Sequence, residues 1–151
     1  MIARLTPDEI HEQDCHTLEV TVTAEQIDRF AAVTGDISPL HMDAEFARQR
    51  GFNDRVSHGV LTLGFFSQLV GVHLPGENAL LQSVNVRFLA PVYPSDRLRI
   101  DAVVDHCSME SGVIVLKIMA SRCASDEIVA KGKIQVGFTQ RSKHELNERR
   151  G

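Results

Sequence analysis

The stretch GDISPLH places a carboxylate, Asp36, five residues before an imidazole, His41. Gly35 suits the end of a helix and Pro39 disfavours helical backbone at Ser38, so we expect the chain to bend between the two side chains. A carboxylate accepts a proton, and a neutral imidazole can accept at one nitrogen while it donates at the other. The pair predicts a device that orients a water molecule and handles its proton. Turns rich in Asp, Ser and Pro are also common as plain structure, so a structural turn is the alternative.

A second candidate is the stretch RVSHGV, which opens a long apolar run. Ser57 can cap a helix there, but its side chain satisfies only one of the N–H groups left free at a helix start. Gly59 carries no side chain that would obstruct a ligand, so the remaining N–H groups and the helix dipole could hold a carbonyl oxygen. If negative charge develops on that oxygen, the helix end is an oxyanion hole. The alternative is that Gly59 only permits close packing.

A metal centre is not expected. His58 could join Asp36 and His41 as a ligand, but neither an HxH nor an HxxxH spacing supports it. The three cysteines are far apart and form no CxxC, which argues against structural zinc and a disulfide framework and favours a reducing compartment. We therefore expect no metal and a cytoplasmic location.

Three helices are predicted around these motifs. Thr23 with Gln26 forms a capping box for the first, and Asp43 is a good N-cap for the second. The third is apolar around most of its circumference, so it must be wrapped on most sides. Their predicted ranges are 23–35, 43–51 and 57–74.

The rest of the chain has the pattern of strands. One strand is expected at 17–22, and four β-rich segments separated by short turns are expected at 80–94, 96–107, 112–124 and 127–138. Short connections make antiparallel neighbours. A mostly antiparallel sheet and one apolar helix that share a single core predict an α+β hot-dog fold, in which a curved sheet wraps a central helix.

Composition limits the classes of function. The chain has 151 residues, the size of one domain, and a net charge of −4, which argues against a nucleic-acid partner. The charge-free run 56–76 contains several polar residues and a proline, so we expect a buried helix and no membrane span. The N-terminus has charges and a proline where a signal peptide needs an apolar run. The tail 139–151 is polar, and we expect it to be solvated.

Taken together, these motifs resemble the MaoC-like hydratase/dehydratase family, which includes the (R)-specific enoyl-CoA hydratases. The resemblance runs from about Val20 to about Phe138 and is carried by FAAVTGDISPLHMDAEFA, GF at 51–52, VSHGVL and VRFLAPVYPSDRL. The first motif is long and specific, and the others support it. In one departure, Ser38 stands where the family usually has Asn, so one short hydroxyl replaces an amide that can fix neighbouring groups.

The resemblance implies a hot-dog homodimer or a larger assembly, with an acyl thioester of coenzyme A or acyl carrier protein as substrate and no cofactor. Water would add reversibly to a trans-2-enoyl thioester to give an (R)-3-hydroxyacyl thioester. Asp36 and His41 would be catalytic, and the Gly59 N–H would bind the thioester oxygen. The substrate would also contact Ser38, Ser57, His58 and Phe65.

Two other functions remain open at this stage. A thioesterase on the same fold would need a carboxylate to activate water, but not an Asp and a His in one loop. A non-catalytic acyl-thioester-binding module would need neither side chain. Several cations could meet the phosphates of coenzyme A, or lie on solvated faces: Arg87, Arg97, Arg99, Lys143, Arg149 and Arg150.

Overall fold

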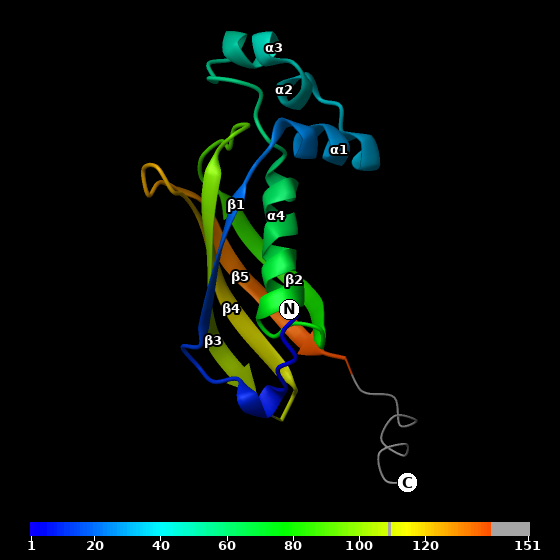
Figure 1. Ribbon diagram of the computed structural model, residues 1–151, viewed down its shortest axis with the longest axis vertical. Coiled ribbons are helices and arrows are strands. Elements are labelled where there is room, and N and C mark those ends of the chain that lie inside the picture. Colours follow the sequence, from blue (N-terminus) through cyan, green and yellow to red (C-terminus); the bar gives the residue numbers. More distant parts are fainter. Residues whose placement is uncertain (109, 140–151) are drawn as a thin grey trace.

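A five-stranded antiparallel sheet forms the body of the protein (Figure 1). The computed structural model describes residues 1–108 and 110–139. The strand order is β1-β3-β4-β5-β2, so β1 and β2 are the two edges. The strands are β1 (Cys15–Thr21), β2 (Ala79–Phe88), β3 (Arg97–Ser108), β4 (Val113–Arg122) and β5 (Ile128–Phe138). This confirms the predicted α+β hot-dog class, since a helix lies along one face of a single antiparallel sheet.

Helix α4 lies along one face of the sheet, and three shorter helices gather beyond one end of it (Figure 1). The helices are α1 (Ala24–Thr34), α2 (Pro39–Met42), α3 (Ala44–Gln49) and α4 (Gly59–Gln68), with a π-helical turn over Leu69–His73 and a 3-10 turn over Pro7–Glu9. No described helix is long and apolar enough to cross a membrane. The predicted polar tail lies, from residue 140 on, outside the described residues.

The core forms where alternate strand residues face α4. On β3, Leu98, Ile100, Ala102 and Val104 are fully buried, while the alternate residues between them are partly exposed. Phe66 and Leu69 meet this face from the helix side and are also buried. Each such side chain contributes roughly 1.5–3 kcal/mol of burial free energy, so the period-2 pattern of the strands and the apolar circumference of α4 together determine how the sheet wraps the helix.

Two of the three predicted helix starts are confirmed. Thr23 and Gln26 form the capping box of α1, and the Asp43 carboxylate accepts from the first N–H groups of α3. The prediction for the third start was wrong. Ser57 does not cap α4, because its N–H donates to Val92 O at 2.7 Å and holds this residue outside the helix. The helix begins two residues later, with His58 as its N-cap and no side-chain cap hydrogen bond.

The bend expected after Gly35 is present, and it contains an element that was not predicted. Gly35 is left-handed (φ 76°) and ends α1, and Ser38 is extended, as Pro39 requires. Pro39 then opens the one-turn helix α2, because its fixed φ and missing N–H suit the first helical position. The segment predicted at 80–94 also differs, since β2 ends at Phe88.

Candidate active site

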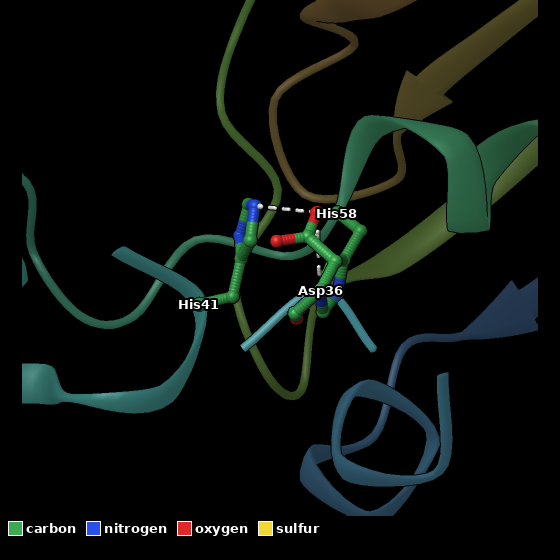
Figure 2. Close-up of side chains that lie close together, drawn as sticks. All are labelled: Asp36, His41 and His58. Atoms are coloured by element: carbon green, nitrogen blue, oxygen red, sulfur yellow. Dashed lines mark hydrogen bonds and ion pairs between the residues drawn. The ribbon is translucent and has the colours of Figure 1, made fainter. Parts of the chain in front are cut away.

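Asp36 and His41 face each other across the bend (Figure 2). Asp36 Oδ2 lies 3.9 Å from His41 Nε2. His41 Nδ1 lies 2.6 Å from the carbonyl oxygen of Val56, and a carbonyl only accepts, so we assign the proton to Nδ1 and a bare lone pair to Nε2. The gap between Oδ2 and Nε2 is too long for a direct hydrogen bond and has the span that one bridging water fills. Such a water donates to both acceptors, which leaves its oxygen lone pairs free to attack.

Local backbone contacts orient the Asp36 carboxylate. The Ser38 N–H donates to Asp36 Oδ1 at 3.3 Å, and the Asp36 N–H donates to the Thr34 hydroxyl at 3.3 Å. Oδ1 is therefore held by the bend, while Oδ2 is the oxygen nearer His41. Ser38 contributes its amide here, and its side chain is exposed without a cap hydrogen bond.

His58 joins the bend to the start of α4. Its side chain is 2% exposed, and its Nε2 lies 2.9 Å from the backbone carbonyl oxygen of Asp36, to which it donates. Its ring stacks on His41, with centroids 3.9 Å apart, and contacts Phe30 at 4.8 Å on α1. Its Nδ1 is buried without a hydrogen-bond partner in the part of the chain that the structure describes. The His58 ring is thus held by Asp36, His41 and Phe30.

A cavity of about 390 Å³ opens beside this pair. No side chain among the described residues caps α4. The Leu61 N–H donates to the His58 carbonyl oxygen, which leaves the N–H groups before it available to a ligand oxygen at the cavity wall. The glycine at this position matters, since a Cβ on Gly59 would lie 3.1 Å from the Phe88 ring. The lining residues are His41, Phe52, Val56, Ser57, Gly59, Thr62, Phe88, Leu89, Ala90, Pro91, Val92 and Val129.

Arg55 fixes the strap between α3 and α4 that carries Val56. Its guanidinium donates to Asp28 at 2.6 Å and to the carbonyl oxygen of Ala24 at 3.2 Å, both on α1. The hydrogen bond from Arg55 lowers the pKa of the Asp28 carboxyl. The strap therefore keeps its place relative to α1, and with it the carbonyl that holds His41.

The structure gathers most, but not all, of the residues singled out from the sequence. His41, Ser57 and Gly59 line the cavity, and Asp36 borders it through His41. His58 lies against His41 and is not among the lining residues. Ser38 points to solvent at the bend and Phe65 packs in the core, so neither lines the cavity. Thr62, Phe88 and Arg55 were missed, because a buried threonine or a tethering arginine has no motif of its own.

The cluster could in principle offer ligands to a metal ion, since Asp36, His41 and His58 place one ligand atom each within 4.8 Å of one another. His58 Nε2, however, already donates to the Asp36 carbonyl, and a nitrogen that carries a proton cannot ligate. As it is arranged, the cluster leaves only His41 Nε2 and Asp36 Oδ2 facing each other, which fits proton handling better than a metal centre that needs three protein ligands.

Fold and site together define the class. An antiparallel sheet around a central helix is the hot-dog arrangement. In this protein His41 and the start of α4 lie on one cavity, with Asp36 beside His41. An R-hydratase from Pseudomonas aeruginosa shares the fold, with a TM-score of 0.85 and 22% identity, over 93% of this chain and 89% of that one.

Sequence comparison gives the family. The "MaoC like domain" family model matches residues 7–136. A 3-hydroxybutyryl-CoA dehydratase from Methylorubrum extorquens is 31% identical over 79% of this chain and 74% of its own length. An (R)-specific enoyl-CoA hydratase from Rhodospirillum rubrum is 26% identical over 85% of this chain and 88% of its own. The chain belongs to the MaoC-like family, and its relatives are hydratases and dehydratases.

Proposed function

We propose that the protein is a hydro-lyase that reversibly adds water to a trans-2-enoyl thioester to give the (R)-3-hydroxyacyl thioester. The observation that carries this proposal is the placement of His41 and the uncapped start of α4 on one cavity, with Asp36 3.9 Å from His41. Hydration of a conjugated double bond needs a proton-handling pair and a donor for the carbonyl oxygen. The names of the relatives, a dehydratase and a hydratase of acyl-CoA compounds, agree with it.

The proposed reaction starts from a water held between Asp36 Oδ2 and His41 Nε2. The water oxygen bonds to C3 while a water proton passes to the pair, and the C2–C3 double-bond electrons move to give an enolate on the thioester oxygen. N–H groups at the start of α4, with that of Gly59 foremost, stabilise this oxygen. The pair then returns a proton to C2, and the reverse sequence is dehydration. Only the elements of water move, so the reaction itself requires no redox or metal cofactor.

His58 serves in this proposal as a positioning residue and not as a substrate contact. Its donation to the Asp36 carbonyl and its stack on His41 hold the two catalytic side chains at a fixed separation. Because reaction rates fall steeply with small displacements of catalytic groups, a single buried ring that touches both residues controls the geometry of the pair.

The acyl group is proposed to be carried by coenzyme A, because the two relatives are named for acyl-CoA compounds. An acyl carrier protein thioester is the second candidate. The three cysteines are free thiols, which fits a reducing compartment such as the cytoplasm.

We further propose that two copies pair along the β2 edge. Five large apolar side chains on or just after this edge strand are at least 40% exposed: Leu80, Leu81, Val84, Phe88 and Leu89. Exposed apolar edge strands invite pairing with another chain. Two of them, Phe88 and Leu89, also line the cavity, so a partner would complete its outer wall. Leu80→Glu should give monomers by light scattering and should lower the activity. Val33→Glu, on the exposed face of α1, is the control and should change neither the oligomeric state nor the activity. A wild-type protein that is monomeric and fully active would exclude the dimer.

The test of function uses crotonyl-CoA and longer trans-2-enoyl-CoAs, with the enoyl-thioester absorbance followed beside an assay for free thiol. Loss of the absorbance without thiol, in wild type but not in Asp36→Asn, is the expected result. Release of thiol would show a thioesterase. An unchanged spectrum with every acyl-CoA, followed by no reaction with the acyl carrier protein thioesters, would show a binding module.

A further inference from the structure

The face of the sheet turned away from α4 carries two unusual pairs of like charges. Arg87 on β2 lies directly opposite Lys131 on β5, and Lys117 on β4 lies directly opposite Lys133 on the same strand β5. Like charges at directly opposed positions of an antiparallel pair destabilise the sheet. A negatively charged group beside either pair would offset this repulsion.

One of the two pairs has its anion within the chain. The Asp105 carboxylate lies 2.5 Å from Lys117 Nζ and 2.7 Å from Lys133 Nζ. Hydrogen bonds from these two ammonium groups lower the pKa of Asp105 to about 2. The other pair, Arg87 and Lys131, forms no ion pair with any residue in 1–108 or 110–139. The same cross-strand arrangement thus occurs once with a carboxylate and once without.

The unmatched pair borders a pocket of about 550 Å³ on this face, within the range of roughly 300–1,000 Å³ typical of small-molecule sites. The matched pair, Lys117 and Lys133, lines the same pocket. The uncharged lining residues are Asn85, Val103, Ile118, Met119 and the side-chain-free Gly132. Asp101 also lies there, but it already binds Arg99 and the Thr17 hydroxyl. An acidic chain of net charge −4 thus presents an unmatched positive charge next to an apolar surface.

We propose that this outer-face pocket binds an amphipathic anion, a long-chain carboxylate. Its head group would lie between Arg87 and Lys131 as the Asp105 carboxylate lies between Lys117 and Lys133, and its chain would cover Met119 and Val103. The two cations explain why the head is an anion, and the apolar lining explains why a hydrocarbon chain accompanies it. A nucleic acid is disfavoured because the chain as a whole is acidic.

The sheet separates this pocket from the catalytic cavity. Successive side chains of a strand point to opposite faces, so Phe88 lines the cavity while its neighbour Arg87 lines the outer-face pocket. Pairing of two copies along the β2 edge would extend the sheet and leave its outer face open. The inference therefore stands independently of the proposed reaction.

Methionine methyl resonances can locate the ligand. Met119 lines the outer-face pocket, whereas Met42 ends α2, next to His41. We expect myristate to shift the 13C-methyl signal of Met119, assigned with Met119→Leu, in a saturable way that weakens as salt screens the cations. Myristate that shifts only the Met42 signal binds on the side that carries the catalytic pair and not in the outer-face pocket, and that result would overturn the proposal.

The anion requirement is tested by ligand and by variant. Arg87→Gln/Lys131→Gln should bind myristate about tenfold more weakly, as expected for two exposed ion pairs, while Arg29→Gln/Arg97→Gln, with the same change in net charge, should bind like wild type. Both variants are checked for folding by thermal unfolding, and Lys131→Gln alone serves if the double variant does not fold. The proposal fails if both double variants bind myristate with equal affinity. It also fails if wild type binds tetradecanol, which lacks the charge, or inorganic phosphate, which lacks the chain, as tightly as it binds myristate.

Discussion

The two faces of the sheet use charged side chains in opposite ways. On the inner side, the cluster of Asp36, His41 and His58 is small. His58 is 2% exposed, and its Nδ1 has no hydrogen-bond partner among the described residues. On the outer side, charges are numerous and most are matched, as the partly buried Asp105 carboxylate matches the exposed Lys117 and Lys133 ammonium groups. Coulomb interactions strengthen as the surroundings of the charges become less polar, whereas exposed pairs are screened and worth about 0–1 kcal/mol each.

Substitutions on the two sides of the sheet should therefore differ in their effects on activity and stability. The contacts of the buried His58 ring on the inner side have few replacements, because the ring is 2% exposed and packs against His41 and Phe30. The Asp36 carboxylate is 51% exposed, and its role depends on its position beside His41. A charge on the outer side can exchange its partner for water or for a dissolved anion at little cost. The following changes test this contrast, from the side where the expected effect is largest.

Asp36→Asn should lower kcat by about 10²–10⁴-fold, because the amide is nearly isosteric but does not accept a proton. The carboxylate is 51% exposed, so the free energy of unfolding should change by less than about 0.5 kcal/mol. Steady-state hydration rates and urea unfolding measure the two effects. Asp126→Asn, an equally conservative change in an exposed turn, is the control; equal hydration rates in the two variants would show that Asp36 takes no part in the reaction.

His58→Phe should lower kcat by about 10–100-fold with little change in KM, because the ring stack remains while the hydrogen bond to the Asp36 carbonyl is lost. His58→Gln can still donate a hydrogen bond and should recover part of the rate. His16→Phe is the matched control, since His16 also stacks on a histidine, His73, at 4.3 Å. If His58→Phe keeps the wild-type kcat, the hydrogen bond does not position the pair.

The His16–His73 stack predicts a pH effect on stability from the inner side. Burial, and then the nearby His73, lower the pKa of His16 below its usual 6.5. The folded state therefore prefers neutral His16, so this contribution is complete above pH 6.5 and is lost as the pH falls from 6.5 through the lowered pKa. Urea midpoints measured from pH 8 to 5 should fall more steeply for wild type than for His16→Phe. Parallel curves would contradict the assignment.

Asp105→Asn should have the smallest effect, a slight fall in the urea midpoint at neutral pH, because its ion pairs are on the outer face. The lowered pKa of Asp105, about 2 against 3.8, means that the carboxylate stabilises the fold above pH 3.8 and loses this effect as the pH falls toward 2. The difference between wild type and variant should therefore shrink over that range. A difference larger at pH 2 than at pH 7 would show another cause.

Local features could be predicted from the sequence because they depend on residues close along the chain. The capping box of Thr23 and the left-handed Gly35 are set by backbone sterics and hydrogen bonds within four residues. The bend between Asp36 and His41 could be predicted from Gly35 and Pro39, whereas the one-turn helix α2 within it was not predicted. The start of α4 could not be predicted in this way, because a contact with Val92, thirty-five residues on, holds Ser57 out of the helix.

The sequence by itself therefore determined the α+β pattern, the one buried helix and the meeting of a carboxylate with an imidazole. Only the tertiary structure decided that His58 holds the Asp36 carbonyl, that Phe88 lies against Gly59 and that Arg87 faces Lys131. The physical reason is the same for all three. Contacts between residues far apart in the chain depend on strand register and on the packing of α4 against the sheet, and a shift of one residue in register turns each side chain to the other face.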